Sequence, residues 1–408
     1  MCATSGTIRR PLATQEMTPV TRFEPNLRIP GPTALPPTVR EAGGRQMVNH
    51  RGEEFRALLK RVEAGVKPWF GTEHDVILLT CAGTGALEAA VVNVLSPGDP
   101  ILAVTMGAFG DRFAKVAEVY GAAVTRLEIE WGKAPAPAAV GEAAAAIAGL
   151  KAVLLTHNET STGVTSDIGA LAAAVREAAP EALILVDGIS ALGAVPFEMD
   201  AWGLDLVVTG SQKAWMSAPG MAMAAVGPRA WKAGETAKMP RFYLDLKRHR
   251  DTQVAGETPW TPAVAVMYQV DEGIRLMNAE GAGVFARHEA CAAMTRAGLR
   301  AIGLKLLADD AVASKTVTAA WIPDGLDWKA FNAGLQRRGL VLAGGQGKLK
   351  GRIFRLGHLG SVTTDDILAA IGALEASAIE QGLAVVPGSA VAAAQAALLA
   401  LRGTETVA

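Results

Sequence analysis

The strongest constraint on the fold of this chain is a regular alternation of short apolar runs with helix-like stretches from residue 53 to residue 210. Runs such as DVILLT (75–80) and ALILVD (182–187) are apolar through their centres, which is typical of strands covered on both faces. The segments between the runs carry apolar residues at helical spacing. This rhythm predicts an α/β fold with a mostly parallel sheet flanked by helices, and such sheets bind ligands at the carboxyl ends of their strands.

The pattern also predicts where the individual elements lie. In the first part of the chain, strands are expected at 75–80, 101–105, 122–129, 151–157, 182–187 and 204–210, and helices at 53–66, 111–121, 139–149 and 167–178. After residue 226 the rhythm loosens, and the stretch 237–262 has no clear core periodicity. Beyond it we expect helices at 263–278, 284–299, 327–338, 364–380 and 386–402, and strands at 305–308, 317–322 and 352–357.

The change in rhythm predicts two domains that follow a short extension. Residues 1–26 lack helical apolar periodicity and the apolar centre of a secretory signal. We therefore expect a flexible N-terminal extension or an arm across a partner subunit, with an organellar transit peptide as the alternative. A large domain is expected at 27–284 and a smaller C-terminal α/β domain at 285–408.

Charge and cysteine content exclude several classes of protein. The chain has 39 Lys and Arg against 40 Asp and Glu, so it lacks the basic footprint of a nucleic-acid-binding protein. Its three cysteines, Cys2, Cys81 and Cys291, are odd in number and form no CxxC pair, so we expect neither a disulfide framework nor a zinc motif, and a cytoplasmic location. Outside Ala-rich helices no uncharged run is long enough for a membrane span.

The first candidate site is the glycine-rich turn CAGTG (81–85), which leads from a strand into a helix. Glycines let the backbone approach an anion, and the new helix offers free N–H groups, so a phosphate site is one interpretation. A tight turn that binds nothing is the alternative. A dinucleotide site is disfavoured, because Glu88 stands where the third glycine belongs and no acidic residue ends the strand at 101–105.

Two further strand ends carry residues suited to a planar ligand. Phe109 lies in the glycine-flanked loop MGAFGDR (106–112), where its ring is either a core anchor or a stacking surface. The segment THNETSTG (156–163) is a dense set of hydrogen-bonding side chains after an apolar strand. A helix-capping turn needs only one or two such residues, so we favour a ligand-facing loop.

The last two strand ends hold charged groups in apolar surroundings. Asp187 ends a buried strand, where a carboxylate is costly unless it is paired. The Asp187 carboxylate either caps a helix or forms a structural salt bridge, or it lies beneath the cationic ring nitrogen of a ligand. Lys213, in GSQK, is flanked by apolar residues, and a desolvated lysine becomes a nucleophile able to form a Schiff base. A snorkelling surface lysine, the alternative, fits these neighbours poorly.

The glycine-rich turn, the aromatic ring, the buried carboxylate and the buried lysine are four features that one cofactor, pyridoxal 5'-phosphate, needs together. Its phosphate binds at a helix start, its ring is stacked, its ring nitrogen pairs with an aspartate, and its aldehyde reacts with a lysine. None of the four is specific by itself. Their order and spacing together predict a site for this cofactor.

The motifs resemble those of class V pyridoxal-phosphate aminotransferases of fold type I, closest to the alanine/serine/aspartate–glyoxylate branch. The resemblance runs from RIPGPT (28–33) to PGSAVAAAQ (387–395) and rests on AGTGALEAA, GAFGDR, THNETSTGV, VDGISALGA, TGSQKAWMSAPG and FRLGHLG. It implies a mostly parallel, seven-stranded sheet flanked by helices and a smaller C-terminal α/β domain. It also implies a homodimer whose subunits share their active sites.

The resemblance implies a role for each matching residue. Lys213 would hold the cofactor as a Schiff base and move a proton at the substrate α-carbon, while Asp187 would keep the ring nitrogen protonated. Arg355 would bind the substrate α-carboxylate, a task that suits the guanidinium fork. The remaining cofactor contacts would come from Phe109 (stacking), Thr160 (near the phenolic oxygen), Gly83, Thr84 and Gln212 (phosphate), and Thr261 of the neighbouring subunit (phosphate).

The expected function is transfer of an amino group from serine, alanine or aspartate to glyoxylate by a ping-pong mechanism. Transfer to pyruvate or another small 2-oxo acid is the nearest alternative; a cysteine-desulfurase-like lyase and a non-catalytic protein that binds the cofactor are more distant ones. Cys291 lies in a helical run where an inert thiol is expected. Cys81 and Ala82, where relatives carry Ser or Thr, and Trp260, where many carry Tyr, depart from the family pattern, so no donor preference is inferred.

Overall fold

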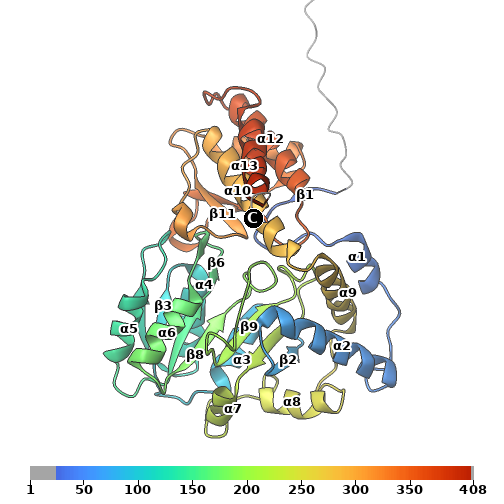
Figure 1. Ribbon diagram of the computed structural model, residues 1–408, viewed down its shortest axis with the longest axis vertical. Coiled ribbons are helices and arrows are strands. Elements are labelled where there is room, and N and C mark those ends of the chain that lie inside the picture. Colours follow the sequence, from blue (N-terminus) through green and yellow to red (C-terminus); the bar gives the residue numbers. More distant parts are fainter. Residues whose placement is uncertain (1–23, 406–408) are drawn as a thin grey trace, which may run out of the picture.

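A seven-stranded sheet forms the centre of the computed structural model, which describes residues 24–405 (Figure 1). The strand order is β2-β10-β9-β8-β5-β3-β4. All pairings are parallel except those of β10, which runs antiparallel to both of its neighbours. The strands are β2 (Asp75–Leu79), β3 (Pro100–Thr105), β4 (Ala123–Glu128), β5 (Ala152–Thr156), β8 (Leu183–Asp187), β9 (Leu206–Gly210) and β10 (Ala222–Val226). The predicted mostly parallel α/β sheet is confirmed.

The antiparallel strand β10 is missing from the sequence-based prediction. Its sequence, AMAAV, is dominated by alanine and methionine, which have little intrinsic preference for strands. Pairing with β2 on one side and β9 on the other completes the sheet, and all five residues are buried. Tertiary pairing therefore overrides local propensity in this segment.

Helices cover both faces of the sheet, and the strand residues alternate between the two cores. One core joins alternate residues such as Val76, Leu78 and Val207 to helices α2 (Glu53–Phe70), α5 (Pro137–Ala145), α6 (Ile168–Ala178) and α9 (Val264–Glu280). The other joins residues such as Ile77, Leu79 and Val208 to α3 (Gly83–Val92), α4 (Ala108–Val119), α7 (Pro228–Gly234) and α8 (Leu246–Val254). Helix α8 lies in the stretch for which no core periodicity was expected, and α2 continues to Phe70, beyond the predicted end at residue 66.

The C-terminal part has its own core, beside a three-stranded antiparallel sheet of order β11-β14-β13. Its elements are α10 (Gly283–Ala301), β11 (Val317–Trp321), α11 (Trp328–Arg337), β12 (Leu340–Val341), β13 (Ala343–Gly344), η2 (Gly347–Leu349), β14 (Ile353–Gly357), α12 (Thr364–Glu380) and α13 (Ser389–Glu405). The strand predicted at 305–308 is wrong: Leu306 forms only an isolated bridge with Ala320, because the chain turns away before η1 (Asp310–Val312). The division at residue 285 stays a prediction, and the separate core supports it.

The beginning of the described chain packs against the C-terminal part. Strand β1 (Asn26–Leu27) pairs in parallel with β12, and α1 (Pro37–Gly43) packs on α9. Most of the predicted N-terminal extension, residues 1–23, lies outside the described residues. The segment between β1 and α1 crosses from the C-terminal part to the carboxyl ends of the central strands, where its backbone contacts Lys213.

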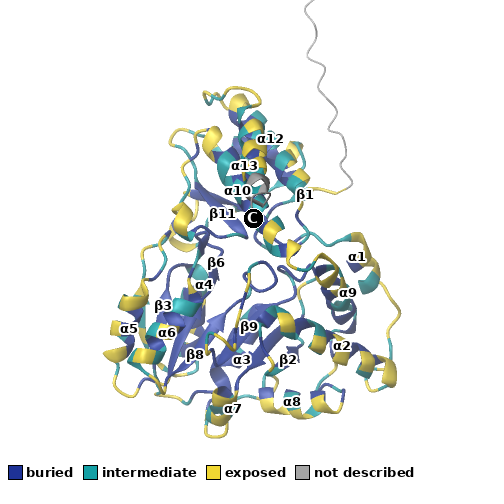
Figure 2. Ribbon diagram, viewed as in Figure 1, coloured by how far each residue is buried: buried dark blue, intermediate teal, exposed yellow. Residues whose placement is uncertain are grey.

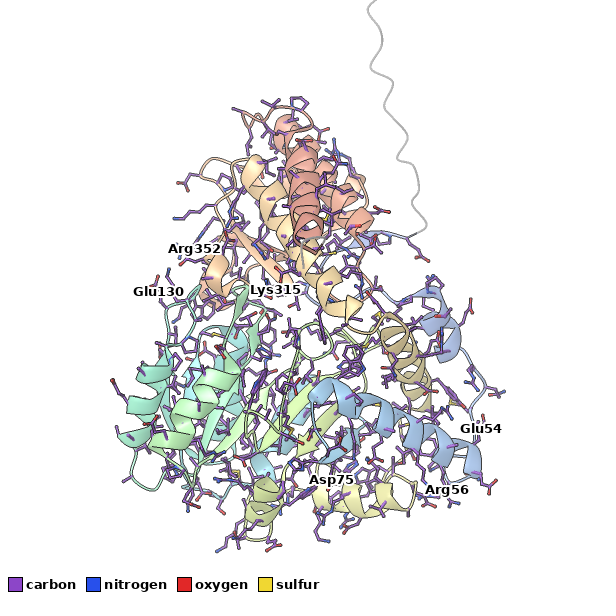
Figure 3. All side chains as sticks on the ribbon, in the orientation of Figure 1. Glu54, Arg56, Asp75, Glu130, Lys315 and Arg352 are labelled. Atoms are coloured by element: carbon purple, nitrogen blue, oxygen red, sulfur yellow. The ribbon has the colours of Figure 1, made fainter. Side chains whose placement is uncertain are left out.

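The distribution of side chains fits this layered arrangement. The central strands are buried and the outer helix faces are exposed (Figure 2), while charged side chains such as Glu54, Glu130 and Arg352 lie at the outside (Figure 3). None of the helices in residues 24–405 combines the length and the apolar character that a membrane span requires.

Candidate active site

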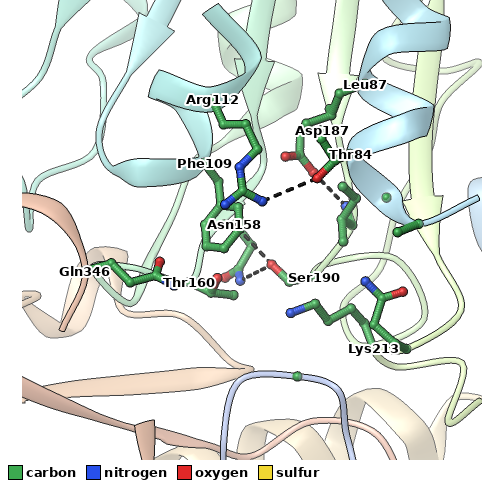
Figure 4. Close-up of a pocket in the computed structure, with 15 residues that line it drawn as sticks. Thr84, Leu87, Phe109, Arg112, Asn158, Thr160, Asp187, Ser190, Lys213 and Gln346 are labelled. Atoms are coloured by element: carbon green, nitrogen blue, oxygen red, sulfur yellow. Dashed lines mark hydrogen bonds between the residues drawn. The ribbon is translucent and has the colours of Figure 1, made fainter. Parts of the chain in front are cut away.

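A pocket of about 250 Å³ lies at the carboxyl ends of the central strands (Figure 4). Residues from five strand ends and from the C-terminal part converge on it, as expected for a parallel sheet. The lining residues are Gly31, Ala82, Gly83, Thr84, Leu87, Phe109, Arg112, Asn158, Thr160, Asp187, Ile189, Ser190, Gln212, Lys213 and Gln346. Seven of the predicted site residues are therefore brought together: Gly83, Thr84, Phe109, Thr160, Asp187, Gln212 and Lys213.

One end of the pocket has the properties of an anion site. Helix α3 begins at Gly83, and its N-cap residue, Ala82, provides no side-chain cap. The backbone N–H groups of Gly83 and Thr84 have no partner among residues 24–405, so they remain free at the positive end of the helix dipole. Arg112 brings its Nη1 to 3.4 Å from the Thr84 hydroxyl, and Gln212 also lines the pocket.

Phe109 occupies a rigid position at the start of α4. Its backbone N–H and that of Gly110 both donate to Oε2 of Glu159, at 3.0 Å each. The Glu159 carboxylate is fully buried, and it also accepts from the backbone and hydroxyl of Ser161. The guanidinium of Arg112 lies 4.8 Å from the centre of the Phe109 ring. These contacts fix the ring at the pocket wall, where it can stack on a planar ligand.

Asp187, at the end of β8, is a buried carboxyl group with few partners. It is only 4 % exposed, and its Oδ1 accepts from the backbone N–H of Ile189 at 2.9 Å. Burial raises the pKa of Asp187 to about 7, although the Ile189 N–H and the nearby Lys213 act in the opposite direction. A cationic hydrogen-bond donor in the pocket would satisfy the remaining lone pairs and stabilise the charged form.

Lys213 projects its amine into the same pocket. The residue is 8 % exposed, and its Nζ donates to the carbonyl oxygen of Pro30 at 2.7 Å. Burial lowers the pKa of Lys213 to about 8, although Asp187 raises it. Roughly a fifth of this amine is therefore neutral near pH 7.4, far more than for an ordinary lysine, and the neutral form is the one that acts as a nucleophile and a base. Thr33 holds the backbone of this loop by donating its hydroxyl to the Lys213 carbonyl at 3.1 Å.

Arg355 lies next to the pocket without being one of its lining residues. From β14 it donates through Nε to the Gly344 carbonyl at 2.9 Å and through Nη1 to the Thr160 carbonyl at 3.0 Å. Its Nη2 has no partner among the described residues. Burial lowers the pKa of Arg355, while Glu159 raises it, and the group remains a cation. Thr261 is exposed and does not line the pocket of its own chain.

Comparison with known proteins shows the family of this chain. The family model for aminotransferase class-V matches residues 38–350, most of the chain. The chain belongs to the class-V aminotransferase family. A soluble hydrogenase small subunit of Synechococcus sp. is 41 % identical, over 91 % of this chain and 98 % of its own. An L-aspartate–glyoxylate aminotransferase of Paracoccus denitrificans is 38 % identical, over 90 % of this chain and 94 % of its own.

A solved structure extends the comparison to the fold. The aspartate aminotransferase of subgroup IV from Thermus thermophilus superposes with a TM-score of 0.82 at 33 % identity, covering 87 % of this chain and 99 % of its own. This agreement confirms the predicted fold of pyridoxal-phosphate aminotransferases of fold type I. The class-V family implies pyridoxal phosphate as the cofactor and identifies the protein as a transaminase that acts on amino acids and 2-oxo acids.

The residues present fit this cofactor. The free N–H groups at the start of α3 and the nearby Arg112 guanidinium are suited to a phosphate, and the buried Asp187 carboxyl is suited to a cationic nitrogen. In contrast, no group of three or more His, Cys, Asp or Glu side chains within residues 24–405 could hold a metal ion.

The sequence-based reasoning missed several lining residues. Arg112 lies one helical turn after Phe109 in the motif GAFGDR. This helical spacing could have indicated that Arg112 lines the pocket as well. Asn158 lies in the motif THNETSTGV and Ser190 in VDGISALGA, and the Asn158 amide donates a hydrogen bond to the Ser190 hydroxyl at 2.8 Å. No signal in the sequence indicated Gln346, which reaches the pocket from the C-terminal part.

Proposed function

We propose that this protein transfers the amino group of a small amino acid, namely serine, alanine or aspartate, to glyoxylate through two ping-pong half-reactions. The observation that carries the proposal is the buried amine of Lys213, which shares one pocket with the buried carboxyl of Asp187. The printed name of the Paracoccus relative supports glyoxylate as the acceptor.

Each residue has a distinct task in this proposal. When bound, pyridoxal phosphate supplies an electron sink for the charge that develops at the substrate α-carbon. Gly83, Thr84 and Gln212 bind the phosphate, while Phe109 and Thr160 hold the ring in place. Asp187 accepts a hydrogen bond from the ring nitrogen and stabilises its positive charge, as the single backbone donor to this carboxyl allows.

Lys213 and Arg355 act on the substrate. The Lys213 amine, whose pKa burial lowers to about 8, holds the cofactor and then takes and returns the proton at the substrate α-carbon. The free Nη2 of Arg355 and its neighbouring Nη1 bind the α-carboxylate, because the other contacts of this guanidinium fix its plane.

An assay with defined substrates tests this function. Purified protein loaded with pyridoxal phosphate is expected to form glycine from glyoxylate with at least one of serine, alanine and aspartate. Pyruvate and hydroxypyruvate, tested in place of glyoxylate, address the nearest alternative. Absence of turnover with every pair would contradict the proposal and would favour a non-catalytic protein that binds the cofactor.

A cysteine-desulfurase-like lyase is disfavoured by the state of the two cysteines that lie within residues 24–405. Such a reaction needs a reactive thiolate, which requires a lowered pKa. Burial instead raises the pKa of Cys81 to about 12, and it does the same for Cys291. Release of sulfide from cysteine by the purified protein would reverse this conclusion.

Replacing Arg355 with lysine is expected to raise the KM for amino donors by at least about tenfold with a smaller effect on kcat. Lysine keeps the positive charge but loses the planar fork that donates to Gly344 and Thr160 while leaving Nη2 free. Steady-state kinetics at several donor concentrations measures both constants. An unchanged KM would show that another group binds the carboxylate.

We further propose that two copies of the chain form a homodimer in which Thr261 contributes to the partner's phosphate site. Thr261 is exposed on a segment that contacts the edge of the phosphate end, where Ala263 N–H donates to the Thr80 hydroxyl at 3.1 Å. The same surface exposes the aromatic side chains of Phe242 and Tyr243. Light scattering measures the mass in solution, and a monomer that is fully active would contradict this proposal.

The free thiols Cys81 and Cys291 support a cytoplasmic location, which we also propose and which cell fractionation would test.

A further inference from the structure

Gln346 enters the pocket without a protein partner. Its side chain comes from the loop between β13 and η2 and lines the pocket together with Thr160 and Phe109 (Figure 4). The Oε1 atom is buried and accepts no hydrogen bond, and the amide makes none elsewhere among residues 24–405. Buried polar groups are normally paired, so an unpaired amide at a pocket wall is expected of a group whose partner is a bound ligand.

The loop around Gln346 is built to hold this side chain in position. A Cβ on Gly345 would lie 2.0 Å from the Leu349 carbonyl oxygen, so only glycine fits there. Gly347 has a φ of +51°, and a Cβ on it would lie 2.8 Å from the Trp131 ring. The chain on both sides of Gln346 is therefore tightly constrained, and the amide is presented by a defined backbone.

The position of Gln346 favours a contact with the substrate over a contact with the cofactor phosphate. Its loop is anchored to Arg355, whose Nε donates to the Gly344 carbonyl and whose Nη1 donates to the Thr160 carbonyl. Figure 4 shows Gln346 beside Thr160 and across the pocket from Thr84, which marks the phosphate end. Arg112, the other cation of the lining, lies near Thr84 and is thus at the phosphate end.

We propose that Gln346 is a specificity-determining residue that binds the side-chain hydroxyl of the amino donor, so that the enzyme prefers serine to alanine. This inference rests on the proposed transaminase function. An amide accepts through Oε1 and donates through Nε2, and among the side chains of serine, alanine and aspartate only the serine hydroxyl can both donate and accept. The methyl group of alanine can form neither hydrogen bond. The side-chain carboxylate of aspartate only accepts, and it would leave the buried Oε1 unpaired.

The kinetic test uses Gln346→Leu, which removes both hydrogen-bonding groups and shortens the side chain by one atom. We expect kcat/KM with serine to fall about tenfold, while kcat/KM with alanine stays within about twofold. Lys348→Ala is the matched control, because Lys348 lies two residues further along, in η2, with an exposed side chain. It should leave both values unchanged. An equal loss with both donors, a loss confined to aspartate, or no loss would each overturn the proposal.

A binding measurement separates this inference from the proposed function. α-Methylserine and 2-aminoisobutyrate lack the α-proton, so they bind without turnover and differ only by the hydroxyl. Calorimetry of the pyridoxal-phosphate-loaded protein should show tighter binding of α-methylserine by wild type and a loss of that preference in Gln346→Leu. If wild type transaminates no donor, the proposed function fails while this measurement still decides the role of Gln346. Equal affinities of the two compounds for wild type would overturn the inference. If Gln346→Leu does not fold, Gln346→Asn provides a second variant, because it keeps the amide on a side chain that is one carbon shorter.

Discussion

Replacing Lys213 with alanine is expected to reduce transamination by at least about 10³-fold. The reason is that one amine has two tasks. It holds the cofactor covalently, and it moves the proton at the substrate α-carbon. Its burial at 8 % exposure and its pKa of about 8 make it the one amine lining the pocket that can do both.

Two measurements check this expectation. After borohydride reduction, the intact mass of wild type should increase by one reduced cofactor, and that of Lys213→Ala should not. Added methylamine or ethylamine should restore part of the activity, since a free amine can enter the space of the deleted side chain. A variant that keeps full turnover, or that still binds cofactor covalently, would contradict the assignment of Lys213. Lys232→Ala, at the solvent-accessible helix α7, is the control for a lysine outside the pocket.

Replacing Asp187 with asparagine is expected to lower kcat by about 10²-fold or more and, at the same time, to stabilise the cofactor-free protein. Asparagine keeps an oxygen for the Ile189 N–H but cannot carry the negative charge that stabilises a protonated ring nitrogen. The gain in stability arises because the charged carboxylate is buried without a cation bound to it.

The pH dependence of this stability effect has a definite sign. Burial raises the pKa of Asp187 from 3.8 to about 7, so between these values the folded protein holds a proton that the unfolded chain has lost. The stability contributed by this group therefore falls as the pH rises from about 4 to 7. The difference in Tm between Asp187→Asn and wild type, both free of cofactor, should be near zero at pH 4 and largest above pH 7. A difference that is constant across this range would show that the carboxyl titrates normally.

Much of the fold and part of the site could be predicted from local patterns. Continuous apolar runs predicted the strands of the parallel sheet, because a strand buried on both faces cannot carry polar residues in its centre. Parallel strands place their carboxyl ends at one edge, so Gly83, Asp187 and Lys213 were expected to meet. The strand β10 was missed because its alanines and methionines carry no local strand signal.

The sequence by itself determined the class of fold, the parallel direction of most strands and the set of side chains at the strand ends, since each of these follows from burial and periodicity within a short segment. Only the tertiary structure decided how the N-terminal and C-terminal segments meet the strand ends of the central sheet. The contact of Arg355 with Thr160 spans 195 positions, and the pairing of β1 with β12 joins the beginning of the described chain to its C-terminal part. Gln346 reaches the pocket in the same way. Local pattern encodes conformation and burial, whereas the meeting of remote side chains depends on the path of the whole chain, and so the group that we expect to select the substrate was found only in three dimensions.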